Sequence, residues 1–145
     1  MAGNLTASMA SLLQNDLYAT ERTGIRLLQV TLDEDGRSAS AQCDLTLNDS
    51  HRNARGQVMG GVLCTLADFA FSAACNAPDV AEGKGLHWVT LDSTMHYLSP
   101  TSGDTLHAKT RCHRQGRTVA LHTIDIIDGT GHVVAQATTT GMRCN

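Results

Sequence analysis

Asp68 is the residue with the clearest chemical potential in this chain, because it is a carboxylate inside an otherwise uncharged apolar segment. The other fifteen residues of 60–75 carry no charge. Apolar residues here recur at helical spacing and also fill the remaining faces, which is typical of a buried helix. No Lys, Arg or His lies three or four residues away to pair with Asp68 along that helix. We therefore expect a buried Asp68 that is hydrogen-bonded across the fold or used in chemistry, and both readings stay open.

Gly60 and Gly61 stand where this helix is expected to begin. Backbone N–H groups at a helix N-terminus have no acceptor inside the helix, so they can stabilise negative charge on the oxygen of an attacked carbonyl. Glycine lets a substrate approach that backbone closely, although a tight entry from loop to helix also favours glycine. Asn53, a little earlier in the chain, is either a second donor to such an oxygen or a residue that caps the loop.

Composition excludes several classes of function. The 145-residue chain has a formal net charge of -3, so we expect neither nucleic acid nor a membrane as its partner. We also expect no run long enough to span a membrane, and the N-terminus lacks the pattern of a signal peptide. The seven histidines form no H-x-x-x-H pair on a helix, so we expect no metal site.

Cysteine and aromatic content bear on compartment and assembly. The five cysteines form no C-x-x-C pair and are odd in number, which favours free thiols in a reducing cytoplasm. Aromatic residues make up only 3% of the chain, so the core is built from small aliphatic groups. A core of this kind is often completed by contacts between subunits, which favours an oligomer.

Hydrophobic periodicity predicts one α+β domain over residues 1–145. The expected elements are a short N-terminal helix over 5–18, strands over 25–33 and 38–47, the buried helix from 60, a loop over 76–85, and strands over 86–98, 105–113, 118–127 and 132–142. Short turns between the late strands predict antiparallel neighbours. The sheet should wrap around the one long central helix, because that helix is apolar on every side.

The segment from Asn53 to Asp68, N-A-R-G-Q-V-M-G-G-V-L-C-T-L-A-D, resembles the signature of hotdog-fold acyl-CoA thioesterases of the PaaI-like group. The resemblance continues through residues 89–100, 114–119 and the last strand, and covers more than half of the chain. It implies a hydrolase with the hotdog fold that converts acyl-CoA thioesters to free acid and coenzyme A. It also implies no cofactor, since coenzyme A is part of the substrate.

The resemblance assigns roles to several residues. Asp68 would be the general base or the nucleophile, and the Gly60 backbone N–H and Asn53 would polarise the thioester carbonyl. Thr90 occupies the position of a family Ser or Thr that orients water, although threonine is also an ordinary strand residue. Further substrate contacts are expected at the helix start, at the end of a strand and in a basic turn: Met59, Gly61, Tyr97, Ser99, Arg114, Gln115, Gly116 and Arg117. The turn would bind the nucleotide end of coenzyme A, or be a solvated turn with ordinary charges.

Met59 is the main departure from the family signature, which has His at this position. A thioether cannot donate a hydrogen bond or carry a proton. Either the chemistry runs through Asp68 and the helix start, with Met59 as an apolar wall, or the activity is slower or altered. A third interpretation is that another histidine, such as His51, takes the missing role.

Spacing predicts how the chain assembles. Gly60 and Asp68 are eight residues apart on one helix, which corresponds to about 12 Å of rise. One thioester carbon cannot contact both in a single chain, so we expect a homodimer with two shared sites, each using the helix start of one subunit and the Asp68 of the other. The resemblance further implies a dimer of dimers, and hence a homotetramer.

Two other functions remain open at this point. A non-catalytic acyl-CoA-binding protein would explain Met59. A hotdog hydratase or dehydratase would need a His paired with an acid, and Asp92 and His96 share one face of a strand. The preferred acyl group is left undetermined.

Overall fold

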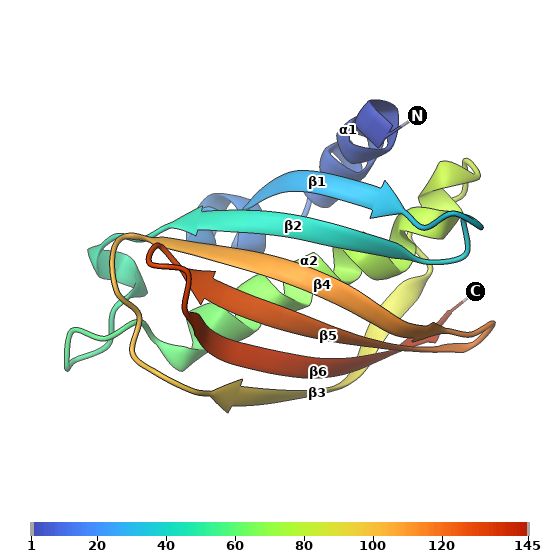
Figure 1. The fold of residues 1–145 in the computed structure, drawn as a ribbon. Coiled ribbons are helices and arrows are strands. Elements are labelled where there is room, and N and C mark those ends of the chain that lie inside the picture. The colour runs from blue at the N-terminus through green and yellow to red at the C-terminus, as the bar shows by residue number, and fades with distance from the viewer. Residues whose placement is uncertain (1, 145) are drawn as a thin grey trace.

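A six-stranded antiparallel sheet curves around one long helix in the computed structural model, which describes residues 2–144 (Figure 1). The elements are α1 (Ala2–Leu13), the π-helix η1 (Tyr18–Thr23), β1 (Arg26–Leu32), β2 (Ala39–Thr46), the 3-10 helix η2 (Asp49–His51), α2 (Gly60–Ala81), β3 (Trp88–Tyr97), β4 (Thr105–Gln115), β5 (Val119–Asp128) and β6 (Val133–Arg143). The sheet and the central helix confirm the expected α+β hotdog fold.

The core lies between α2 and the inner face of the sheet. In β5 the buried and half-buried residues alternate, as a strand with one face on a core requires. Gly141 of β6 leaves room for the ring of Phe71 from α2, because a Cβ at Gly141 would lie only 2.7 Å from the Phe71 Cζ. Phe71 in turn packs edge-on against the buried His122, with 5.2 Å between the ring centroids.

The sheet order corrects one expectation about connectivity. The strands lie in the order β1-β2-β4-β5-β6-β3, so β3 pairs with β6 and does not neighbour β4. The segment 98–104 is therefore a crossing connection at the end of the sheet, and the expected hairpin turn there was wrong. The N–H groups of Leu98 and Ser99 both donate to the Val134 carbonyl, which holds the end of β3 against β6. This places β3 at an edge of the sheet.

The central helix is longer than expected, and the predicted loop over 76–85 was wrong. α2 continues through Pro78 to Ala81 although Pro78 lacks the N–H donor of a helical hydrogen bond. The Asn76 Oδ1 accepts the N–H groups of His87 and Trp88, which ties this end of α2 to β3. By length and composition α2 reaches a membrane span, contrary to expectation. However, 61% of its most apolar window is buried within the protein, as in the core helix of a folded domain.

The N-terminal helix is shorter than expected, since α1 ends at Leu13. The next segment forms the π-helix η1, which ends at Gly24 with φ 91°, a left-handed conformation that favours glycine. The Thr23 carbonyl accepts a 2.7 Å hydrogen bond from the His51 Nε2. His51 thereby joins the N-terminal segment to the loop that leads into α2.

Candidate active site

Asp68 is exposed in the single chain, so the expectation of a buried carboxylate was wrong. It belongs to a stripe of exposed residues on α2 that also contains Gly61 and Cys64. The stripe exists because the sheet packs against the other faces of the helix, where Leu66 and Ala70 are fully buried. The carboxylate therefore faces a surface cleft instead of the core.

Thr90 of β3 donates a 2.7 Å hydrogen bond from its Oγ1 to the Asp68 Oδ1. The pairing of β3 with β6 shifts register between Thr90 and Asp92, which leaves Leu91 as a bulged residue. Bulges re-aim neighbouring side chains and are frequent next to functional sites. Here the bulge allows Thr90 and Tyr97, at odd separation in the strand, both to contact α2.

The start of α2 is open and free of side-chain capping. Met59 is its N-cap residue, makes no capping hydrogen bond and is 54% exposed. The N–H groups of Gly60 and Gly61 lie in the first turn, where a helix offers them no acceptor. These donors can therefore bind a ligand oxygen.

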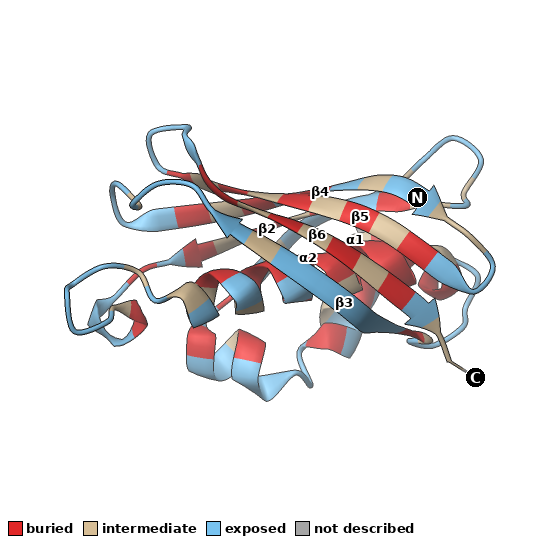
Figure 2. Ribbon diagram, turned by 90° about the horizontal axis from the view of Figure 1, so that it is seen from below, coloured by how far each residue is buried: buried red, intermediate tan, exposed pale blue. Residues whose placement is uncertain are grey.

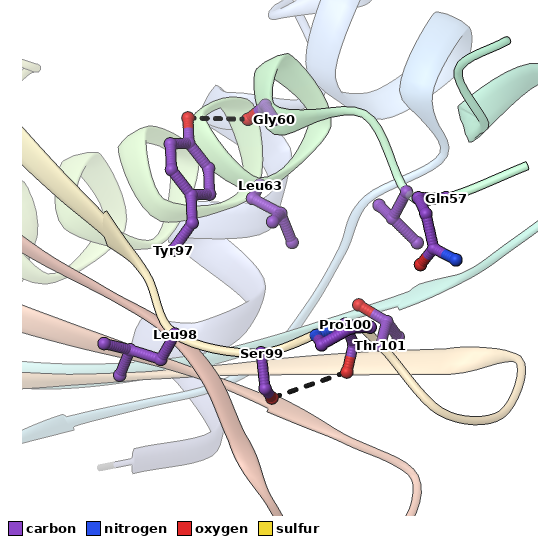
Figure 3. Close-up of a pocket in the computed structure, with 9 residues that line it drawn as sticks. Gln57, Gly60, Leu63, Tyr97, Leu98, Ser99, Pro100 and Thr101 are labelled. Atoms are coloured by element: carbon purple, nitrogen blue, oxygen red, sulfur yellow. Dashed lines mark hydrogen bonds between the residues drawn. The ribbon is translucent and has the colours of Figure 1, made fainter. Parts of the chain in front are cut away.

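Tyr97 lies over this helix start (Figure 3). Its Oη donates to the Gly60 carbonyl at 3.3 Å and lies 3.1 Å from the Cys64 Sγ. The hydrogen bond with Cys64 raises the pKa of Tyr97 above its ordinary value. A Cβ at Gly60 would be only 3.0 Å from the Tyr97 Oη, so glycine allows this close approach.

A cleft of about 490 Å³ opens beside the helix start. Its lining residues are Gln57, Val58, Gly60, Leu63, Tyr97, Leu98, Ser99, Pro100 and Thr101. The structure thus brings together three residues expected to contact substrate, namely Gly60, Tyr97 and Ser99, as Figure 3 shows. The segment after β3 forms the wall opposite α2.

Asn53 caps a turn in the loop before α2. Its Oδ1 accepts from the N–H groups of Arg55 at 2.9 Å and Gln57 at 3.1 Å. Within the part of the chain that the structure describes, the Asn53 Nδ2 has no acceptor. Asn53 therefore caps the loop through its side-chain oxygen, and its amide nitrogen remains available to a ligand.

His51 does not take the place of the missing family histidine. It is 3% exposed, its Nδ1 accepts from the Asn48 N–H at 3.0 Å, and its Nε2 donates to Thr23. Both ring nitrogens are hydrogen-bonded within the protein. Nδ1 accepts and Nε2 donates, which corresponds to the neutral tautomer with the proton on Nε2. Its role is to hold the loop in place, since its own carbonyl accepts the Met59 N–H.

The basic turn lies at the other end of α2. Arg114 and Arg117 are exposed, but the Gln115 side chain points into the core, where it donates to the Cys75 carbonyl and accepts from the His122 Nε2. Gly116 is required by the turn, because a Cβ there would lie 2.8 Å from the Val119 carbonyl oxygen. A cleft of about 460 Å³ beside the turn is lined by Gly36, Arg37, Pro78, Asp79, Glu82, Lys84, Trp88, Gln115, Gly116, Arg117 and Arg143.

Asp68 lies in a third cleft, of about 290 Å³, lined by Asp16, Tyr18, Ala19, Cys64, Thr65, Asp68 and Phe69. Sequence analysis missed Asp16 and Tyr18, because they are about fifty residues from Asp68 and only the fold brings them there. Across the described residues, no group of three or more His, Cys, Asp or Glu side chains is placed to hold a metal ion.

The antiparallel sheet around one central helix identifies a hotdog-fold protein, and Asp68 of that helix lines a surface cleft. Comparison with known sequences gives the family. Residues 55–135 match the Thioesterase superfamily. The chain therefore belongs to the thioesterase superfamily. Human acyl-coenzyme A thioesterase 13 is 28% identical over 96 residues, which cover 65% of this chain and 66% of that protein. The acyl-coenzyme A thioesterase PaaI of Escherichia coli is 33% identical over 92 residues, covering 63% and 61%.

Structural comparison extends the likeness to almost the whole chain. The PaaI protein of the Escherichia coli phenylacetic acid degradation operon has a TM-score of 0.79 and 25% identity, covering 97% of this chain and 96% of that one. The sequence matches span no more than about two thirds of the length of the curated relatives. Acyl-coenzyme A thioesterase is the class of enzyme that these relatives define.

Proposed function

We propose that this protein hydrolyses acyl-CoA thioesters to the free acid and coenzyme A. The observation that carries the proposal is the Thr90-oriented carboxylate of Asp68 in a surface cleft, on the same helix whose first turn offers free N–H donors. Relatives named acyl-coenzyme A thioesterases support it. Water is the only co-reactant that the reaction needs, so we propose no cofactor beyond the coenzyme A carried by the substrate.

The geometry gives each group a task. Thr90 holds one oxygen of the Asp68 carboxylate, which leaves the other to accept a proton from water or to attack the thioester carbon. The carbonyl oxygen gains negative charge as the new C–O bond forms, and the Gly60 N–H and the Asn53 amide donate to it. The C–S bond then breaks, and the coenzyme A thiolate leaves and takes up a proton that comes from the water consumed in the reaction. Where Asp68 is the nucleophile, that water then hydrolyses the acyl–Asp68 anhydride, which releases the free acid and restores the carboxylate. The base and nucleophile roles of Asp68 both fit this geometry.

Each site requires two chains. Gly60 and Asp68 lie eight residues apart on α2, about 12 Å along its axis, and they line different clefts. β3 is an edge strand with eight of its ten residues exposed, and it forms the pale blue edge in Figure 2. Antiparallel pairing of β3 with its two-fold copy would set the start of one α2 beside the Asp68 of the other. We therefore propose a homodimer with two shared sites.

The same symmetry gives the basic turn a role. The start of α2 and the turn between β4 and β5 lie at opposite ends of the folded domain (Figure 1). An antiparallel dimer would place the turn of one subunit near the helix start of the other. Arg117, with Arg37 from the β1–β2 turn, has no ion-pair partner within the described residues and would meet the phosphates of coenzyme A. Gln115 would act by shaping the turn, because its side chain is committed to the core.

Met59 would form an apolar wall at the helix start. It is exposed beside Gly60 and makes no capping hydrogen bond, so it adds neither proton nor donor to the site. The remaining chemistry would run through Asp68 and backbone donors. Association of two dimers into a tetramer and a cytoplasmic location, which suits five free cysteines, complete the proposal.

A non-catalytic acyl-CoA-binding protein is the second candidate, and Met59 favours it. The hydratase alternative loses support, because Tyr97 contacts α2 and His96, next to it in the strand, therefore points to the opposite face of the sheet. Asp92, four residues before His96, shares that outer face and so points away from α2.

The deciding experiment measures thiol release from a panel of acyl- and aryl-CoA thioesters by the wild type and by Asp68→Asn. We expect turnover by the wild type and loss of turnover in the variant, with coenzyme A binding kept. Coenzyme A binding without turnover in either protein would favour the non-catalytic binder.

A further inference from the structure

The cleft that holds Asp68 has a second wall, built by the segment between α1 and β1. Asp16, Tyr18 and Ala19 supply this N-terminal wall, opposite Asp68 and its neighbours on α2. The segment lies outside the region 55–135 that matches the thioesterase family. The family match therefore does not describe the wall, although the structural likeness to the Escherichia coli PaaI protein covers 97% of this chain.

Backbone hydrogen bonds hold the N-terminal wall in a defined position. The Asp16 carbonyl accepts from both the N–H and the Oγ1 of Thr20, at 3.0 and 2.9 Å. The Ala19 carbonyl accepts the N–H groups of Gly24 and Ile25. The Tyr18 side chain nevertheless remains 66% exposed. The wall is thus preformed in its backbone and presents a free aromatic side chain to the cleft.

The electrostatics of this cleft favour a particular kind of acyl group. Two carboxylates, Asp16 and Asp68, line it, and none of its lining residues is Lys, Arg or His. A ligand that carries its own carboxylate is repelled there. The exposed ring of Tyr18 offers an apolar face instead, whereas Phe69 lines the cleft but is only 3% exposed. The volume of about 290 Å³ is at the lower end of the range for ligand pockets, which suits a small group.

We propose that the N-terminal wall selects the acyl group of the substrate. Tyr18 contacts a small uncharged acyl group, preferentially a ring, and Asp16 rejects acyl groups that end in a carboxylate. This inference rests on the proposed thioesterase function and deepens it by naming the acyl class. Neither residue takes part in bond breaking, so both act on selectivity.

The test compares kcat/KM for benzoyl-, butyryl-, succinyl- and palmitoyl-CoA among wild type, Tyr18→Ala and Asp16→Asn. Leu17→Ala and Glu21→Gln are matched controls, since both residues are exposed, lie beside the wall and do not line the cleft. The wild type should prefer benzoyl- and butyryl-CoA. Asp16→Asn should raise the succinyl-to-butyryl ratio about tenfold, because one repelling charge is removed. Tyr18→Ala should lower the benzoyl-to-butyryl ratio about fivefold, because a ring contact is lost. The controls should change neither ratio.

Two negative results have different meanings. The first is a wild type that hydrolyses the panel while folded Asp16→Asn and Tyr18→Ala keep its kcat/KM ratios. That result would disprove selection by the N-terminal wall and leave the proposed thioesterase function intact. A wild type inactive on every thioester instead overturns the proposed function. Asp16→Ser and Tyr18→Phe provide second variants, and circular dichroism melting shows that each is folded.

Discussion

Thr90 and Asp68 are joined by a 2.7 Å hydrogen bond from the threonine Oγ1 to the carboxylate Oδ1. The bond links the edge strand β3 to the middle of α2, across 22 positions in the sequence. It occupies one carboxylate oxygen and, within the described residues, leaves the Asp68 Oδ2 without a donor. Thr90 is therefore a positioning residue for the carboxylate that we propose acts on the thioester.

Replacing Thr90 by Val should lower kcat while leaving KM nearly unchanged. Valine keeps the shape of the side chain and removes the donor, and a hydrogen bond to a charged group is worth about 2 kcal/mol, or roughly thirtyfold in rate. Steady-state kinetics of Thr90→Val and Thr90→Ser make the comparison, and the serine variant should restore most of the activity. A Thr90→Val variant with the kcat of the wild type would show that the hydroxyl has no role.

Asn53→Asp separates the two roles of Asn53. The aspartate keeps an oxygen for the Arg55 and Gln57 N–H groups but removes the amide donor. We expect roughly a hundredfold loss of kcat, typical of a lost oxyanion donor, with an unchanged melting temperature. Asn53→Ala should in addition lose about 1 kcal/mol of stability, because two loop N–H groups lose their acceptor. Full activity in Asn53→Asp would leave Asn53 as a loop cap only.

Mixing two inactive variants tests the shared site. In a heterodimer of Asp68→Asn and Asn53→Asp, one of the two sites contains wild-type Asn53 from one chain and wild-type Asp68 from the other. After unfolding and refolding as an equimolar mixture, about a quarter of the wild-type activity should return. The variants refolded separately serve as controls. A mixture as inactive as its components, or a fully active monomer in sedimentation, would rule out sites shared between chains.

Met59→His should increase turnover. An imidazole at the N-cap position of α2 would add a hydrogen-bond donor beside Gly60, and a tenfold gain corresponds to about 1.4 kcal/mol of transition-state stabilisation. Met59→Leu is the matched control, because leucine has a similar volume and adds no hydrogen-bond donor. Identical rates in all three proteins would show that the site already works without an imidazole.

His122 should make the fold less stable in mild acid. Its burial, followed by the charge of His113, lowers the pKa of His122 to about 4 from the ordinary 6.5. Between those pH values the unfolded chain binds a proton that the folded chain does not. The stability that the neutral His122 contributes is therefore fully present above pH 6.5, and it is lost as the pH falls towards 4. The free energy of unfolding should drop by about 2 kcal/mol from pH 7 to pH 5 through this residue.

Urea unfolding at fixed protein concentration checks this pH dependence. His122→Leu should remove that share of the pH dependence, whereas His96→Gln, at an exposed strand position, should retain it. The same slope in His122→Leu and the wild type would assign the acid sensitivity to other groups.

The sequence by itself determined the main elements and located several residues of the candidate site. Hydrophobic alternation located all six strands to within about two residues, because one face of each packs on a core. The uncharged segment from Gly60 revealed the central helix, and the isolated carboxylate within it singled out Asp68. These signals are local, since each depends on residues a few positions apart.

Only the tertiary structure decided which residues meet. The edge position of β3 depends on long-range pairing with β6, and the exposure of Asp68 depends on which faces of α2 the sheet covers. In the folded chain the Gln115 side chain points into the core, and the His51 ring is hydrogen-bonded to the Thr23 carbonyl. Tyr18 lines the same cleft as Asp68. No local pattern encodes these contacts, because they arise when segments far apart in the chain pack together.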